Sequence, residues 1–106
     1  MWRFIMENEI LKPTVCPNVL VKHDDKNEGL DVEVDLPAVD KNKIDLTLGE
    51  SGFCVYAERD DEKYEGCFHL AHLVNKNKAK AKYENGLLKF NVPFKESIKE
   101  KNIRIE

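Results

Sequence analysis

Hydrophobic and polar residues alternate along several short stretches of the chain, and this pattern predicts β-strands. The clearest stretch is 30–36, where four apolar side chains alternate with three carboxylates. A strand with this pattern turns its apolar side chains toward a core and its carboxylates toward water. The same alternation marks 44–48 and 53–57, and shorter apolar runs predict strands at 18–23 and 67–70.

The strongest short-range signal is the pair Asn85-Gly86, which separates two alternating arms at 79–83 and 88–92. A type I′ turn needs positive φ at both central positions, which Asn tolerates and Gly adopts freely. Pro93 ends the second arm because it has no N–H to give to a neighbouring strand. The stretch is therefore predicted to be a β-hairpin, whose apolar faces must pack on more sheet because an isolated hairpin is marginal.

About seven short strands at regular spacing, with no convincing internal helix, predict an all-β fold, an antiparallel β-sandwich. We expect one such domain at 17–95, preceded by a short N-terminal arm at 1–16 and followed by a charged tail at 96–106. Within the arm, residues 2–11 carry apolar side chains at helical spacing. A short amphipathic helix and a mobile arm both remain open there.

Composition and charge narrow the class of protein. The 106 residues are 42% hydrophobic and 35% charged, which is typical of a folded chain with a well-solvated surface. The net charge of −3 disfavours a nucleic-acid partner, and the lysines that alternate along 76–82 are more typical of a solvated face. No apolar run reaches the length of a membrane span, and the apolar start at 1–6 is too short for a signal peptide. We therefore expect an intracellular, cytoplasmic protein.

Enzymatic and metal chemistry find little support. The two serines, Ser51 and Ser97, do not lie in a Gly-x-Ser-x-Gly motif, and no Gly-rich phosphate loop occurs. Cys67 and His69 would share one face of a strand, but His72 would point to the other face. Because spacing alone is a weak signal, surface histidines are the favoured interpretation. The sequence predicts no catalytic residue, no cofactor and no metal site.

The three cysteines are Cys16, Cys54 and Cys67, an odd number without Cys-x-x-Cys spacing. In a reducing cytosol, free thiols are the default expectation. If 53–57 and 67–70 form a hairpin, however, Cys54 and Cys67 fall opposite each other. A redox-linked bridge between them is therefore the alternative.

The tail holds the second informative motif. Ile103 and Ile105 lie two residues apart in a charged segment, so an extended backbone projects both to one side. Two β-branched hydrophobes in this position either fold back on their own domain or dock on a neighbour.

Together these motifs resemble the small heat-shock proteins and their α-crystallin domain, over about residues 18–106. That family has the signature Ala-x-x-x-Asn-Gly-Val-Leu and a tail motif Ile-x-Ile or Ile-x-Val. The strand at 32–37 and the pair Phe68-x-Leu70 also fall where the family has strands. The signature hairpin residues in this chain are Ala81, Asn85, Gly86, Leu87 and Leu88.

The resemblance implies an immunoglobulin-like sandwich, a homo-oligomer, and ATP-independent binding of non-native client proteins. It also implies that the tail motif docks between the fourth and eighth strands of another subunit. We expect the apolar set of 79–83 to point into the sandwich, which leaves the opposite face for docking. The tail-docking groove is then predicted to be lined by Ile44, Leu46, Leu48, Lys80 and Lys82. Candidate client contacts in the arm are Trp2, Phe4, Ile5 and Met6.

The chain also departs from the family pattern. The loop at 59–65 is too short to carry the swapped strand that builds many family dimers, and the N-terminal arm is short. Gly66 stands where an Arg is usual, and Ala71 where a Pro is usual. Two functions therefore remain. We expect the first, a holdase that blocks aggregation of partly unfolded proteins, which Ile103 and Ile105 favour. The alternative is a co-chaperone-like adaptor for one folded partner, which the short loop and the short arm favour.

Overall fold

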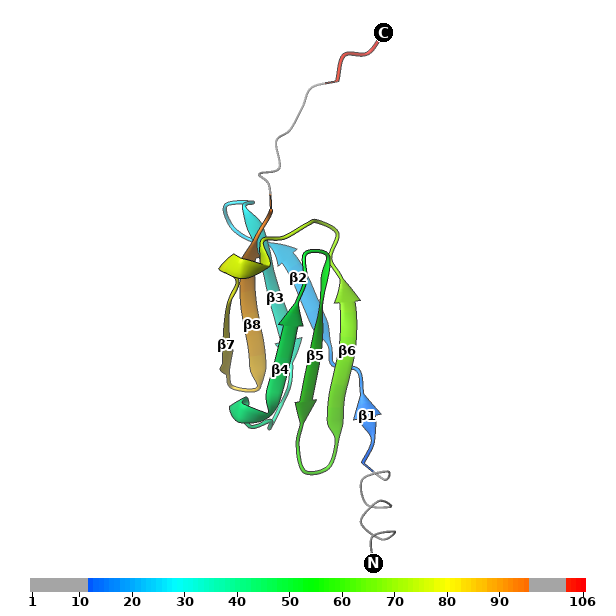
Figure 1. Cartoon of the computed structure of the whole chain (residues 1–106), viewed down its shortest axis with the longest axis vertical. Helices are drawn as coiled ribbons and strands as arrows, with labels where there is room; N and C mark the ends of the chain where they lie inside the picture. Colours follow the sequence, from blue (N-terminus) through cyan, green and yellow to red (C-terminus); the bar gives the residue numbers. More distant parts are fainter. Residues whose placement is uncertain (1–11, 96–102) are drawn as a thin grey trace, which may run out of the picture.

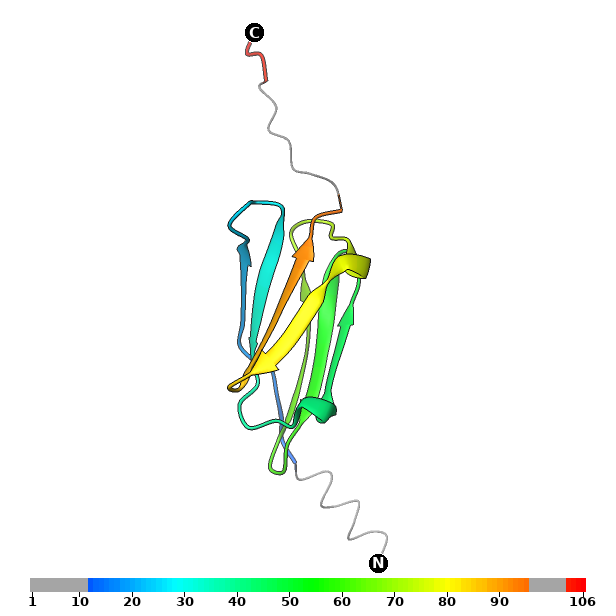
Figure 2. The same cartoon turned by 90° about the vertical axis from the view of Figure 1, so that its left-hand side faces the viewer.

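The predicted all-β sandwich is confirmed in the structure, a computed structural model that describes residues 12–95 and 103–106. Two four-stranded sheets pack face to face (Figures 1 and 2). In chain order, the elements are β1 (Thr14–Val15), β2 (Val19–His23), β3 (Gly29–Asp35), η1 (Lys41–Lys43), β4 (Ile44–Leu48), β5 (Gly52–Glu58), β6 (Lys63–His69), η2 (Lys76–Lys78), β7 (Lys80–Glu84) and β8 (Leu87–Pro93).

The strand order is β1-β6-β5-β4 in one sheet and β2-β3-β8-β7 in the other. Strand β1 pairs with β6 in parallel, and every other pairing of named strands is antiparallel. The edge strands β4 and β7 lie on the same side of the sandwich, and β1 and β2 lie on the opposite side (Figure 1). Each side therefore presents two sheet edges.

The core lies between the sheets and follows the predicted alternation. Strand β3 buries Val32 and Val34 and directs Asp31 and Glu33 to its outer face. Phe90 of β8 meets Phe53 of β5 edge to face, with ring centroids 5.1 Å apart, which joins the two sheets. The buried set is Leu30, Val32, Val34, Leu36, Val39, Phe53, Val55, Ala57, Tyr64, Leu70, Val74, Leu88, Phe90, Val92 and Phe94.

The β7–β8 hairpin forms around the predicted turn. Asn85 and Gly86 have φ of 53° and 79°, the left-handed values that a type I′ turn requires. The Leu36 N–H donates to the Gly86 carbonyl oxygen at 2.8 Å, so the turn also anchors the end of β3. A Cβ on Gly86 would lie 3.2 Å from the Pro37 Cα, which is a tight contact.

The β5–β6 hairpin differs from the prediction. Strand β6 begins at Lys63 rather than at Cys67, and it ends one residue before Leu70. Its turn is only four residues long and is held by Arg59, whose guanidinium contacts Asp61 at 2.8 Å and Glu62 at 2.6 Å. These side-chain contacts are not visible in the alternation of the sequence, so the strand was predicted too short.

Candidate functional site

The first candidate surface is the side of the sandwich where β4 and β7 end the two sheets. On β4, Ile44, Leu46 and Leu48 are half-buried and pack against the core, whereas Asp45 and Thr47 are exposed on the other face. A sheet edge leaves unpaired backbone N–H and C=O groups, which can accept another strand. The β4 edge therefore combines apolar side chains with free backbone groups.

On β7 the two faces separate cleanly. Tyr83 packs against the core together with Ala79, the residue just before the strand, and Ala81 faces the same way but is exposed. Their inward direction is as the sequence predicts. Lys80 and Lys82 point to the outer face, where they pair across the strands with Asn91 and Lys89.

This register corrects the predicted tail-docking groove. Ile44, Leu46 and Leu48 face the interior of the sandwich, so Lys80 and Lys82 on the outer face do not line a common cleft with them. Side chains alternate between the faces of a sheet, so residues that flank an inward Ala81 cannot face inward themselves. The structure brings the two lysines together with β8 and separates them from β4.

Tyr83 has a role that the sequence did not indicate. Its hydroxyl donates to the Leu36 carbonyl oxygen at 2.6 Å and accepts from the Val39 N–H at 3.3 Å. Val39 is itself buried. The tyrosine therefore ties the β7 edge to the loop that follows β3. The only sign of this role in the sequence is that a residue with a hydroxyl group occupies an inward position of the 79–83 arm.

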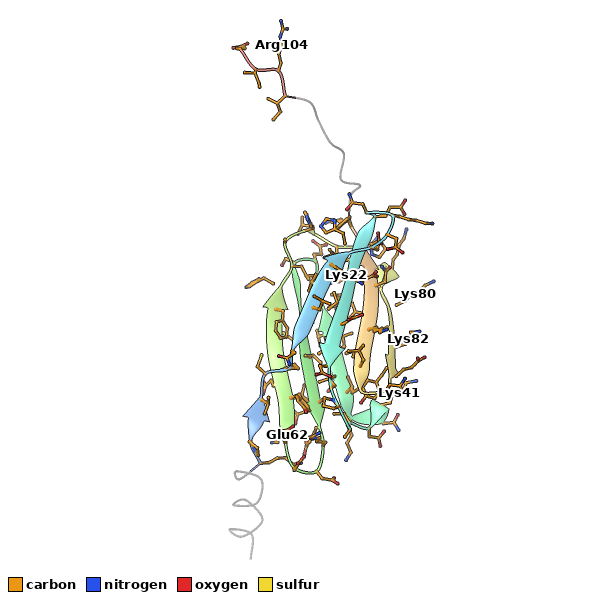
Figure 3. The ribbon with its side chains drawn as sticks, turned by 180° about the vertical axis from the view of Figure 1, so that it is seen from behind. Lys22, Lys41, Glu62, Lys80, Lys82 and Arg104 are labelled. Carbon is orange, nitrogen blue, oxygen red and sulfur yellow. A yellow bond between two sulfur atoms is a disulfide. The ribbon has the colours of Figure 1, made fainter. Side chains whose placement is uncertain are left out.

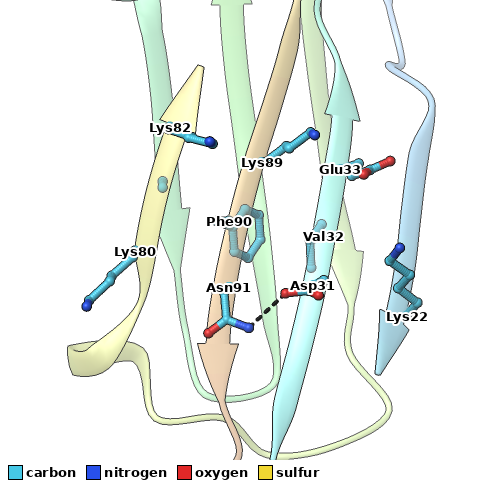
Figure 4. A pocket seen from close by; sticks show the side chains of 10 residues that line it. Lys22, Asp31, Val32, Glu33, Lys80, Lys82, Lys89, Phe90 and Asn91 are labelled. Atoms are coloured by element: carbon cyan, nitrogen blue, oxygen red, sulfur yellow. Dashed lines mark hydrogen bonds between the residues drawn. The ribbon is translucent and has the colours of Figure 1, made fainter. Parts of the chain in front are cut away.

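The second candidate surface is a hollow of about 410 Å³ on the outer face of the β2-β3-β8-β7 sheet (Figures 3 and 4). The Asn91 side-chain amide donates to Asp31 Oδ1 at 2.8 Å across the middle of the sheet. The charged residues that line the hollow are Lys22, Asp31, Glu33, Lys80, Lys82 and Lys89.

The structure describes the predicted tail motif but not the predicted client contacts of the arm. Ile103 and Ile105 are 82% and 94% exposed, so neither is packed on the core of its own domain. The candidate client contacts Trp2, Phe4, Ile5 and Met6 lie outside the described residues, as does the proposed N-terminal helix. Within the described part, the exposed large hydrophobic residues are Val15, Leu20, Val21, Leu73, Ile103 and Ile105.

Comparison with known proteins decides the family. A model of the Hsp20/alpha crystallin family matches residues 22–106, which is most of the chain. The chain belongs to this family. Small heat-shock proteins are in general non-enzymatic chaperones that form oligomers and bind non-native proteins, and this general chaperone role extends to the chain. A comparison with curated proteins finds no match.

Solved structures agree with the family assignment. A Del-C4 mutant of hsp14.1 from Sulfolobus is 26% identical over 79% of this chain and 80% of its own, with a TM-score of 0.67. Heat shock protein 16.0 from Schizosaccharomyces pombe is 20% identical, covers 87% of this chain and 99% of its own, and has a TM-score of 0.68. The CS domain of human KIAA1068 protein has the same fold, at 19% identity, 87% and 82% coverage, and a TM-score of 0.63.

The structure accounts for one departure from the family pattern. A Cβ on Gly66 would meet the Phe68 ring at 2.9 Å and Cys16 Sγ at 3.3 Å. Phe68 itself stacks on Phe53 with ring centroids 5.1 Å apart. An arginine at position 66 would have to displace the Phe68 ring and the Cys16 side chain, so the glycine suits the packing of these two side chains.

The cysteines correct the expectation of free thiols. Cys54 and Cys67 are directly opposed on β5 and β6 and form a disulfide, with their Cα atoms 4.0 Å apart. This is the bridge that the sequence analysis gave as the alternative, for the case in which the two strands form a hairpin. Cys16 is free and exposed.

The histidines do not form the set that the spacing of Cys67, His69 and His72 suggests. Cys67 is in the disulfide, and His72 packs with His23 and Phe94, with ring centroids 5.2 Å and 5.0 Å away. Among residues 12–95 and 103–106, no three metal-ligating side chains come together, and no helix is long and apolar enough to cross a membrane.

One ion pair ties the entry of the chain to the β5–β6 hairpin. Lys12 Nζ lies 2.6 Å from Glu58 Oε1, and the Tyr56 hydroxyl donates to Glu58 Oε2 at 3.0 Å. These two hydrogen bonds, that of Lys12 being the stronger, lower the pKa of the Glu58 carboxyl. Glu58 therefore stays ionised and anchors the chain next to β1.

Proposed function

We propose that the chain is an ATP-independent holdase, which binds partly unfolded proteins and prevents their aggregation. The observation that carries this proposal is the β4 edge, where Ile44, Leu46 and Leu48 are only half-buried beside free backbone groups. Apolar surface of this kind gains about 25 cal/mol for each Å² that a client covers. Non-native chains expose such surface, so they are the partners that this edge suits.

We further propose that the tail assembles the oligomer. Ile103 and Ile105 are almost fully exposed, and both would project to one side of an extended tail. Seated on the β4 edge of a second subunit, each would gain about 1.5–3 kcal/mol on full burial. Clients and tails would then compete for the same apolar edge.

The test of assembly compares three chains by size-exclusion chromatography with light scattering. The double variant Ile103→Ala/Ile105→Ala should form smaller particles and melt at the same temperature as the intact chain. Arg104→Ala is the matched control, because Arg104 lies between the isoleucines and projects to the other side of an extended tail. Unchanged particle size in the double variant would mean that the tail does not assemble the oligomer.

The test of holdase activity uses heat-denatured citrate synthase, which needs no reductant and so leaves the Cys54–Cys67 disulfide intact. The intact chain should suppress the light scattering of the aggregating enzyme without ATP. Leu46→Ala should suppress it less, whereas Thr47→Ala, on the exposed face of the same strand, should act like the parent. If the intact chain leaves the scattering unchanged, the holdase proposal is wrong.

A specific observation favours the second function, an adaptor for one folded partner. The β5–β6 connection is only four residues long, Arg59 to Glu62, and its ends are closed by a hydrogen bond from the Arg59 N–H to the Glu62 carbonyl oxygen at 3.0 Å. It offers no strand to exchange with a second subunit. A monomeric chain without holdase activity would make the adaptor the better proposal.

We also propose a cytoplasmic location. The Cys54–Cys67 bond puts this proposal to the test, because structural disulfides are rare in reducing compartments such as the cytoplasm. Mass spectrometry of the protein alkylated at the moment of cell lysis would show whether the pair is reduced there. A fully oxidised pair would count against a reducing cytoplasm.

A further inference from the structure

The hollow on the outer face of the β2-β3-β8-β7 sheet has an ordered arrangement of charges. Strand register places two rows of side chains across the four strands. The first row runs Lys22, Asp31, Asn91, Lys80, and the second runs Leu20, Glu33, Lys89, Lys82. Acidic groups therefore stand on β3, and three of the four lysines stand on β8 and β7 (Figure 4).

The lysines on β7 and β8 are arranged at a cost to the sheet. Lys82 and Lys89 are direct cross-strand partners on the same face, and like charges in that relation are destabilising. On its other side Lys89 is the cross-strand partner of Glu33, an opposite charge that favours the pairing of β8 with β3. Lys80 follows two residues away on the same face. Lys82 has one ion pair, with Glu84 at 3.8 Å, and both side chains are 66% exposed. Within the described residues, Lys80 and Lys89 have no carboxylate within 4.0 Å.

We propose that this hollow is a docking site for an acidic, extended segment of a partner protein. Residues two apart on a strand repeat at about 6.6–6.8 Å, so carboxylates at alternate positions of an extended segment match Lys80 and Lys82. A carboxylate between Lys82 and Lys89 would offset their mutual repulsion. This surface is separate from the β4 edge, and the proposal does not rest on the holdase.

The shape of the hollow adds an apolar component. Val32, Ala81 and Phe90 also belong to its lining, and the lysine side chains carry aliphatic stems beside their ammonium groups. A segment in which apolar and acidic residues alternate would therefore contact both kinds of surface.

The same residues disfavour a nucleic acid as the occupant. A nucleic acid carries a phosphate at every nucleotide, whereas a peptide segment can place its carboxylates over the lysines of β7 and β8 and leave Asp31 and Glu33 of β3 uncovered. Single strands also bind by stacking bases on aromatic side chains, but the one aromatic residue of the lining, Phe90, is only 3% exposed.

The test uses the full chain and a synthetic, end-blocked peptide in which Glu and Val alternate. Titration followed by amide chemical shifts should move the signals of residues 80–82 and 89–91, and fluorescence anisotropy should give the affinity. The variant Lys82→Gln/Lys89→Gln should bind more weakly, by up to about 25-fold, since each exposed ion pair contributes up to about fivefold. Lys41→Gln/Lys43→Gln is the control, with the same charge change on η1 and outside the hollow.

Five outcomes would overturn the proposal. Equal weakening in the two double variants would show attraction to net charge alone. Shifts confined to β4, or no binding, would exclude the hollow. Tighter binding of a single-stranded oligonucleotide of equal charge would assign the face to nucleic acid. Self-association of the unliganded chain that Lys82→Gln/Lys89→Gln abolishes would mean that a second copy covers it. Melting temperatures of the variants, whose changes are on the surface, separate these results from misfolding.

Discussion

The two long hairpins of the sandwich are held together in different ways. The β7–β8 hairpin turns through Asn85-Gly86, whose backbone conformation suits the turn by itself. The β5–β6 hairpin has a longer, charged turn and depends on side-chain links, namely the Arg59 ion pairs and the Cys54–Cys67 disulfide. Local backbone preference can be seen in the sequence. Links between side chains appear only when the strands are already paired.

The largest expected effect contrasts two aromatic residues, one from each hairpin, that pack on the same ring of Phe53. Phe90 is 3% exposed, and Phe68 is half-buried near the free edge of β6. Phe90→Ala should reduce the free energy of unfolding by about 3–5 kcal/mol, as a buried large-to-small change. Phe68→Ala should cost clearly less, because it removes less buried surface. Urea unfolding of both variants measures the difference, and equal losses would contradict the packing described.

The second effect concerns the disulfide of the β5–β6 hairpin, which closes a sequence separation of 13 residues. Cys54→Ala/Cys67→Ala should reduce the free energy of unfolding by about 3 kcal/mol, since the unfolded chain is no longer cross-linked. Cys16→Ala, at the exposed free thiol, is the control and should cost little.

Thiol titration of the denatured protein checks the same pairing without mutation. One reactive thiol is expected before reduction and three after it. Three reactive thiols in oxidant-treated protein would exclude the bridge and restore the expectation drawn from the sequence.

The third effect tests the turn of the β7–β8 hairpin. Gly86→Ala forces a Cβ into the left-handed region and within 3.2 Å of the Pro37 Cα, so it should cost about 1–2 kcal/mol. Gly49→Ala is a matched control, because its new Cβ would lie at an ordinary 3.6 Å from the Gly52 carbonyl oxygen. Denaturant midpoints compare the two, and a Gly49→Ala cost equal to that of Gly86→Ala would show that the turn conformation is not the cause.

The same contrast explains what could be predicted from the sequence. Strands β3 and β8 follow from strict alternation, and the Asn85-Gly86 turn follows from its φ requirement. Strand β1 could not be predicted, because it has only two residues and exists through a parallel pairing with Lys63 and Tyr64. The early start of β6 was missed for a related reason, since charged residues near a turn carry no alternation.

The candidate site shows the limit of what the alternation of apolar and polar residues can predict. Alternation placed Ala79 and Tyr83 inward and Lys80 and Lys82 outward, in agreement with the structure. It did not show that the outer face of β7 and the inward side chains of Ile44, Leu46 and Leu48 lie on opposite sides of the β2-β3-β8-β7 sheet. That arrangement depends on how β4 and β7, which belong to different sheets, are placed in the sandwich. The predicted groove combined residues from two faces for this reason, and the charged hollow around Lys89 was missed.

The smallest expected effect concerns the ion pair between Lys12 and Glu58, a further side-chain link at the β5–β6 hairpin. The hydrogen bond from Lys12 lowers the pKa of Glu58 in the folded state. A carboxyl whose pKa is lower in the folded than in the unfolded chain adds stability above its unfolded pKa. That stability is lost as the pH falls through the folded pKa. The contribution is therefore present at neutral pH and is lost in acid, below the ordinary range of a glutamate.

Glu58→Gln should lower the melting temperature slightly at pH 7, and the difference from the parent should vanish in acid. Glu65→Gln is the control, because Glu65 is exposed on β6 and forms no ion pair with a described residue. Melting curves across the acidic range measure both variants. A difference for Glu58→Gln that persists unchanged in acid would show that packing, and not the charge of Glu58, connects residue 12 to the hairpin.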